Sequence, residues 1–195
     1  ANGRGVTADP AEAVKWYRLA ALQGHADAQT NLGVLYDNGQ GVTQDLAEAV
    51  KWYRLAATQG NARGQFNLGV MYYKGEGVTR DYAEAVKWYR MAAAQGYARA
   101  HYNLGVAYAA GHGVTRDYAE ALRWFRLAAA QGFGAARFRL AFMHALGQGI
   151  AQDFVRAQMW LDLGIAAGDP ESVMNREIFS ANMTPRQLAE AQKMA

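Results

Sequence analysis

Apolar positions along this chain follow two helical stripes that alternate. The first stripe has apolar residues four apart, which is the spacing of one face of a short helix; its clearest copy is Ala28, Leu32 and Tyr36. The second stripe follows about fifteen residues later and combines one large aromatic residue with small ones; its clearest copy is Ala49, Trp52, Ala56 and Ala57. The pattern therefore predicts pairs of short amphipathic helices.

The pair of stripes returns every 36 residues without drift. Five tryptophans keep this interval, at Trp16, Trp52, Trp88, Trp124 and Trp160. Five loop glycines keep it too, at Gly5, Gly41, Gly77, Gly113 and Gly149. A fixed period between 20 and 50 residues is typical of a solenoid, in which each unit buries its apolar face against its neighbours.

Polar residues mark where each predicted helix begins and ends. Asp45 stands before the second stripe with Glu48 three residues on, as an N-cap with a capping-box-like partner would. Gly60 follows the same stripe, where a left-handed C-cap is expected. A Gly-x-Gly-Val loop separates the two helices of a pair, and its Val or Ile is expected to anchor the loop in the core; these residues are Val42, Val78, Val114 and Ile150.

Glycine also recurs inside the first helix of each pair, at Gly33, Gly69 and Gly105. A glycine in a helix interior costs about 1 kcal/mol relative to alanine. We therefore expect these glycines to permit a close approach between helices.

The pattern changes at both ends. The unit near Phe133 loses several repeat residues, as terminal repeats do. After Gly168, Asp169-Pro170 and Thr184-Pro185 predict two further helices. We expect a solenoid over residues 1–168, made of a half repeat and four helix pairs, and capping helices over 169–195. Residues 2–7 have the pattern of a repeat loop, so we expect the native chain to continue upstream. If the chain folds as given, Trp16, Tyr17 and Leu19 lie on a helix without its usual partner, and we expect another chain to cover them.

The segment from Ala28 to Gly60, "AQTNLGVLYDNGQGVTQDLAEAVKWYRLAATQG", resembles the Sel-one-like repeat (SLR) family, relatives of the tetratricopeptide repeats. The resemblance covers about residues 2 to 168. It implies an all-α, right-handed superhelical solenoid that serves as an adaptor for other proteins. Bacterial members of this kind are often exported, which favours a periplasmic or secreted location.

Residues for catalysis or metal binding are sparse. The chain has no cysteine, its serines are Ser172 and Ser180, and its four histidines fall at four different repeat positions. No histidine pair has helical ligand spacing with a carboxylate. We therefore predict no enzyme activity, metal or cofactor. An enzyme with an unrecognised nucleophile is the alternative.

Basic residues recur on the second helix, at Lys15/Arg18, Lys51/Arg54, Lys87/Arg90 and Arg123/Arg126, and could follow a phosphate backbone. The net charge is only +3, however, and a glutamate stands three residues before one basic residue in each repeat. Such spacing favours local ion pairs on a solvated face. RNA binding is therefore the less favoured interpretation.

Variable positions on a fixed scaffold are the candidates for partner binding. Three rows of the first helix differ between units: Gln29, Gln65, His101 and Arg137; Thr30, Phe66, Tyr102 and Phe138; Asp37, Tyr73, Ala109 and Ala145. Beside them runs a ladder of Asn31, Asn67 and Asn103, followed by Arg139. A side-chain amide both donates and accepts, so this ladder could hold a peptide main chain, or it could bridge adjacent repeats.

The resemblance to tetratricopeptide relatives implies that first helices line a concave groove, so we expect an adaptor that binds a protein or peptide on this concave face. In this interpretation the asparagine ladder contacts main chain, Phe66, Tyr73, Tyr102 and Phe138 make apolar or stacking contacts, and Arg137 and Arg139 favour an acidic end of the ligand. The alternative is an envelope component that binds cell-wall glycan or an envelope enzyme, since tryptophan and tyrosine also stack on sugars.

Overall fold

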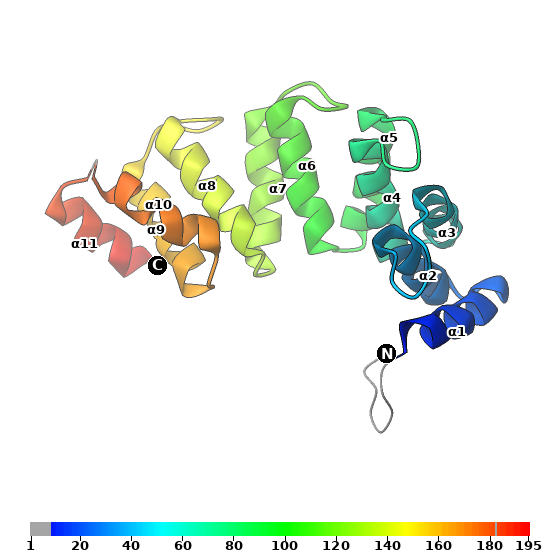
Figure 1. Cartoon of the computed structure of the whole chain (residues 1–195). Coiled ribbons are helices and arrows are strands. Elements are labelled where there is room, and N and C mark those ends of the chain that lie inside the picture. Colours follow the sequence, from blue (N-terminus) through cyan, green and yellow to red (C-terminus); the bar gives the residue numbers. More distant parts are fainter. Residues whose placement is uncertain (1–8, 182) are drawn as a thin grey trace. The chain divides into compact units, whose positions relative to one another are not determined.

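The computed structural model describes residues 9–181 and 183–195, and in those residues it contains eleven α-helices and no strand (Figure 1). The helices are α1 (Pro10–Leu22), α2 (Ala26–Asn38), α3 (Leu46–Thr58), α4 (Ala62–Lys74), α5 (Tyr82–Ala94), α6 (Ala98–Ala110), α7 (Tyr118–Ala130), α8 (Gly134–Leu146), α9 (Phe154–Ala166), α10 (Pro170–Ser180) and α11 (Pro185–Met194). Gly5 and the predicted loop at residues 2–7 lie outside the described residues.

Consecutive helices pack as pairs, α2 with α3, α4 with α5, α6 with α7 and α8 with α9 (Figure 1). Each pair is joined by the predicted glycine loop; in the α4–α5 loop, for example, Gly75 and Gly77 have φ angles of +77° and +69°. The valine that follows Gly77, Val78, packs against the core as expected. The prediction of an all-helical array of 36-residue helix pairs is confirmed.

The chain forms two compact units, residues 1–97 and residues 98–195. In the first unit, α1 to α5 enclose a core that includes Leu32, Tyr53 and Leu68. In the second unit, α6 to α9 repeat this arrangement, and α10 and α11 pack against α9. The two helices predicted after Gly168 are therefore present, with Asp169 and Thr184 as their N-caps.

The aspartate N-caps are confirmed, but the capping-box partner is not. Asp81 Oδ1 accepts from the Glu84 amide at 3.0 Å, which satisfies a free donor of the first turn of α5. The Glu84 carboxylate does not reach back to the cap; it forms an ion pair with Lys87 Nζ at 3.1 Å. A lysine one turn ahead competes for the carboxylate, and in the described residues a complete capping box occurs at Thr184 and Gln187.

In three of the helix pairs, the aromatic residue at the centre is the one that follows the repeated tryptophan. Tyr53, Tyr89 and Phe125 are each 1% exposed, whereas Trp52 and Trp124 are half-buried. A Cβ on Gly69 would lie 2.7 Å from the Tyr89 ring, so the helix glycine leaves room for this aromatic side chain. The expected close approach of helices is confirmed.

Helix α1 leaves its tryptophan exposed, whereas α5 buries the tryptophan at the equivalent position. Trp16 is 64% exposed, while Trp88 at the equivalent position of α5 is 9% exposed. Leu19 and Leu22 are also exposed. In the described residues, no helix is both long and apolar enough to cross a membrane.

Candidate functional site

The asparagine ladder lies on the first helices α2, α4 and α6, and all three side chains are half-buried. Asn31 Oδ1 accepts a hydrogen bond from Arg63 Nη1, on α4, at 3.0 Å, so this asparagine does bridge adjacent repeats. Among the described residues of its own unit, neither the Asn67 nor the Asn103 side chain forms a hydrogen bond.

The aromatic candidates of the first unit differ in how much surface they present. Phe66 is buried, with its ring centroid 5.2 Å from that of Tyr97 and 5.9 Å from that of Tyr89. Tyr73 is half-buried and packs edge-on against Tyr82 at 5.0 Å. Burial, and to a smaller extent Tyr82, raises the pKa of Tyr73. Phe66 is thus enclosed by neighbouring rings, whereas Tyr73 keeps part of its ring accessible to solvent.

Two candidates of the second unit lie in direct contact. Arg139 Nε, on α8, donates to Tyr102 Oη, on α6, at 3.3 Å. The Tyr102 ring also packs against Phe133, with centroids 5.0 Å apart. Burial lowers the pKa of Arg139, but the Tyr102 hydrogen bond and the Glu171 carboxylate outweigh it and raise that pKa overall. The guanidinium is consequently held in place and charged.

Arg137 and Phe138 point into different surroundings from Arg139. Arg137 Nη1 donates to the backbone carbonyl of Leu163, on α9, at 2.8 Å. Phe138 is half-buried in the cluster around Leu161 and lies 6.3 Å from Phe142, measured between ring centroids. Arg137 is therefore bonded within its own helix pair, whereas Arg139 is bonded to Tyr102 of another pair.

The variable row of Gln29, Gln65 and His101 is buried, which differs from the exposed position that its variability suggests. Gln59 Nε2 donates to Gln29 Oε1 at 2.7 Å, and Gln95 Nε2 donates to Gln65 Oε1 at 2.9 Å. At the same place in the next repeat, Gln131 Nε2 lies 3.1 Å from His101 Nδ1. Each member of this row therefore forms a buried polar pair with the glutamine at the C-terminal end of the second helix of its own helix pair.

Two of the cavities in the second unit lie beside α8, and the repeat pattern did not reveal them. One, of about 250 Å³, lies between α6, α7 and α8, and its lining includes Val106, Phe125, Arg139 and Phe142. The other, of about 260 Å³, is bounded by α8, the start of α9 and α10, and is lined by Phe142, Ala145, Leu146, Gln152, Phe154, Ile178 and Phe179. The sequence feature that could have indicated these cavities is the loss of repeat residues after Phe133, because different side chains there pack differently from those of the other repeats.

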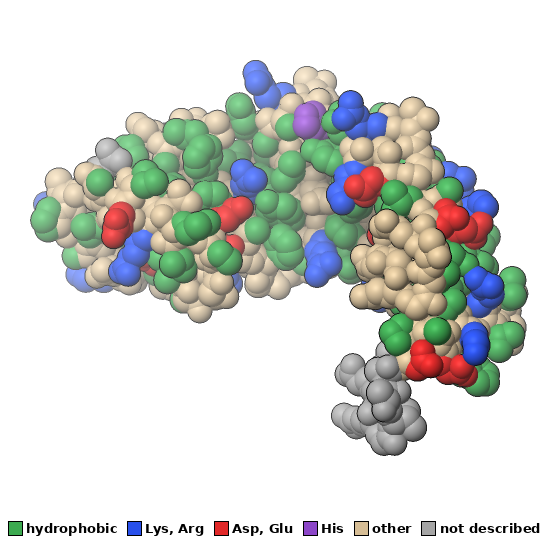
Figure 2. All heavy atoms as spheres, in the orientation of Figure 1, with side chains coloured by type: hydrophobic (Ala, Val, Ile, Leu, Met, Phe, Trp, Pro, Cys, Tyr) green, Lys and Arg blue, Asp and Glu red, His purple; other side chains and the backbone are tan. Residues whose placement is uncertain are grey.

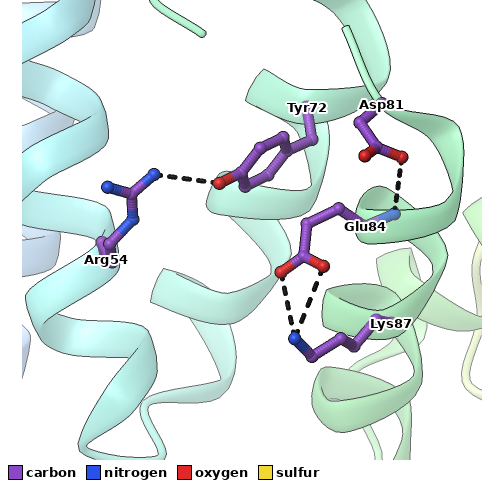
Figure 3. A network of polar contacts seen from close by, with 5 residues as sticks. All are labelled: Arg54, Tyr72, Asp81, Glu84 and Lys87. Atoms are coloured by element: carbon purple, nitrogen blue, oxygen red, sulfur yellow. Dashed lines mark hydrogen bonds and ion pairs between the residues drawn. The ribbon is translucent and has the colours of Figure 1, made fainter. Parts of the chain in front are cut away.

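Basic side chains of the second helices are occupied by neighbours (Figure 3). Lys87 pairs with Glu84, and Arg54 Nη2 donates to Tyr72 Oη, on α4, at 2.9 Å (Figure 3). The same pairs recur as Lys51 with Glu48 and Arg18 with Tyr36. The predicted local ion pairs are confirmed, and these contacts weaken the case for a phosphate-binding row.

Groups that could hold a metal do not converge. In the residues that the structure describes, no three His, Asp or Glu side chains form a potential metal site. Ser172 is buried and donates to the N-cap carboxylate of Asp169 at 2.6 Å, so it serves the start of α10. His144 is buried, and the loss of solvent around the imidazole lowers its pKa.

This geometry defines a class of protein, an array of helix pairs with a variable first-helix face. The Sel1 repeat family matches five consecutive segments, residues 1–25, 26–61, 62–97, 98–133 and 134–169. The chain therefore belongs to the Sel1 repeat family. No curated protein sequence matches it significantly.

Solved structures agree with this assignment. A protective antigen of uropathogenic Escherichia coli strains, which displays an SLR fold, is 38% identical with a TM-score of 0.86; the match covers 99% of this chain and 42% of that protein. A Sel1 repeat protein from Oxalobacter formigenes is 34% identical with a TM-score of 0.86, over 97% of this chain and 78% of that one. The immunity protein PA5088 of Pseudomonas aeruginosa, 20% identical with a TM-score of 0.59 over 98% of this chain and 75% of its own, shares the fold alone.

Proposed function

We propose that this chain is an adaptor that binds a protein or peptide segment along the face formed by its first helices. The observation that carries the proposal is the pair Asn67 and Asn103, which stand at equivalent positions of α4 and α6 and have no side-chain hydrogen bond in their own units. An amide side chain can both donate to and accept from a peptide main chain, whatever the peptide's sequence. Asn31 is in part committed to Arg63 and contributes less.

The neighbouring side chains favour a ligand with apolar and acidic residues. Tyr73, on α4, and Tyr102, on α6, present half-buried rings, and aromatic rings contribute large contact areas with few rotatable bonds. Arg139 adds a fixed positive charge. Phe66 acts as support, and Arg137 would have to leave the Leu163 carbonyl before it could reach a ligand.

Family membership supports binding rather than catalysis, because repeat arrays of this type use a fixed scaffold to present a varied surface. The scattered histidines and the structural role of Ser172 are in keeping with a non-enzymatic chain.

Affinity capture from the source cell, read by mass spectrometry, tests the proposal. The wild-type array is compared with an Asn67→Ala plus Asn103→Ala variant whose folding is checked by circular dichroism. The matched control is Asn38→Ala, an exposed asparagine at the end of α2. We expect specific partners to be lost from the double variant and kept by the control. Equal capture by all three proteins would contradict a role for this face.

A further inference from the structure

The two cavities beside α8 are neighbours that share one wall, the side chain of Phe142. Phe142 is 41% exposed, and its row on the surface continues with the exposed Leu146 of α8 and Ile178 of α10. Figure 2 shows hydrophobic side chains spread over the visible face of this unit, with separate charged side chains between them. Exposed apolar side chains that line adjacent hollows are typical of interaction sites.

The size of each cavity fits one side chain rather than a whole small molecule. Cavities of about 150 Å³ accommodate a benzene ring, whereas pockets for drug-sized ligands start at about 300 Å³. The two cavities, at about 250 and 260 Å³, fall between these values. Each can therefore receive one large apolar side chain.

Charge in this region selects the ligand further. Arg139 lines the first cavity. Among the described residues, its side chain donates one hydrogen bond, from Nε to Tyr102 Oη. A guanidinium carries five N–H donors, so the terminal nitrogens can bind a carboxylate in the bidentate manner. Glu171, on α10, is a carboxylate that acts electrostatically on Arg139, and it reduces but does not remove this attraction.

We propose that the two cavities separated by Phe142 form a peptide-anchoring site, which takes two large apolar side chains of a partner and pairs an acidic residue between or beside them with Arg139. This inference rests on the proposed function, since it names the ligand class for the same first-helix face. It also gives α10 a second role, because Ile178 and Phe179 complete the outer cavity. The C-terminal helices thus cap the array and contribute to its binding site.

A displayed library of random twelve-residue peptides, selected on the full chain, tests the site. We expect enriched peptides to combine Asp or Glu with two large apolar residues. By fluorescence anisotropy, Arg139→Glu and Phe142→Lys should each weaken these peptides by about tenfold or more, because each removes a central anchor. The matched controls are Arg186→Glu on α11 and Leu127→Lys on α7, which make the same changes at exposed positions outside the cavities and should bind as the wild type does.

The outcomes separate this inference from the proposed function. Peptides that bind Arg139→Glu and Phe142→Lys unchanged, but lose affinity for Asn67→Ala plus Asn103→Ala, would overturn the cavity site alone. Absence of any enriched peptide on the folded chain would overturn both. Sedimentation of the unliganded chain covers another occupant: if Phe142→Lys turned a dimer into a monomer, the site would be an interface between copies and the peptide assignment would fail.

Discussion

Gly69, on α4, faces the ring of Tyr89, on α5, so closely that a Cβ on the glycine would lie 2.7 Å from two ring carbons. Tyr89 is 1% exposed and cannot turn outward into water. Equivalent contacts join Gly33 to Tyr53 and Gly105 to Phe125. Three of the helix pairs therefore combine a glycine of low helix propensity in the first helix with a large aromatic side chain at the centre of the pair.

Replacement of Gly69 by alanine should destabilise the chain by about 1–3 kcal/mol, because the Tyr89 ring would have to move within a packed core. Helix propensity acts in the opposite direction by about 1 kcal/mol, so the sign of the change identifies the dominant effect. Urea unfolding followed by circular dichroism measures it. A stabilised Gly69→Ala variant would show that α4 and α5 are not in tight contact here.

Tyr53 donates its phenolic proton to Asp37 Oδ2 at 3.1 Å, and we expect Tyr53→Phe to cost about 1 kcal/mol. The third repeat provides the natural comparison, since Phe125 there stands opposite Ala109 and needs no acceptor. Adding Asp37→Ala to Tyr53→Phe should therefore recover part of the loss. If the double variant were no more stable than Tyr53→Phe alone, the hydrogen bond would not be the cause.

The same tyrosine makes stability depend on alkaline pH. Burial, together with the nearby Asp37 carboxylate, raises the pKa of Tyr53 above its ordinary value near 10. Because the unfolded chain releases this proton first, the contribution of Tyr53 is complete below about pH 10 and is lost as the pH rises further. The free energy of unfolding of Tyr53→Phe should fall less steeply above pH 10 than that of the wild type.

His144 replaces the repeat tyrosine, and His144→Tyr should remove an acid sensitivity. Burial lowers the pKa of His144 below its usual value of about 6.5, so the unfolded state binds the proton more readily. Wild-type stability should then decrease as the pH falls through about 6.5. In the variant this loss disappears, and the new hydroxyl can accept from Arg126 as Tyr72 accepts from Arg54.

The control for the His144 prediction is His25→Gln, because His25 is exposed before α2. Its unfolding curves should follow those of the wild type between pH 5 and pH 8. Equal acid sensitivity of wild type and His144→Tyr would assign the effect to other groups. Thermal or urea unfolding at several pH values provides the comparison.

Trp16 and Trp88 occupy the same repeat position, but replacing each by alanine should change the free energy of unfolding by very different amounts. Trp88→Ala removes a buried side chain and should cost about 3–5 kcal/mol. Trp16→Ala, on the exposed face of α1, should change the stability of the monomer by less than about 0.5 kcal/mol. Urea unfolding at low protein concentration distinguishes the two.

We also predict that the chain associates with a second copy of itself through the exposed face of α1. Analytical ultracentrifugation at increasing concentration should show oligomers for the wild type and fewer for Trp16→Ser, because Trp16, Leu19 and Leu22 present apolar surface to water. Leu127→Ser, at an exposed position of α7, is the control. A strict monomer at high concentration would count against this pairing.

Much of this architecture was predictable because it follows from local rules. The 36-residue period, the aspartate N-caps and the glycine loops each depend on residues a few positions apart, and all agree with the structure. The interior Gly69 predicted a close contact, but helical period could not name Tyr89 as the partner. The tryptophan is the more regular aromatic residue of the repeat, but the tyrosine that follows it is the residue at the centre of the core.

The class of fold, the repeat unit and the position of each row of side chains on its helix follow from the sequence alone. Which rows meet water could not be predicted, because burial depends on how neighbouring helices pack rather than on the helix itself. Gln65 varies yet is buried against Gln95, while Asn67, two residues away, is half-exposed. The contact of Arg139 with Tyr102, and the cavities on either side of Phe142, likewise arise where helices distant in sequence pack together.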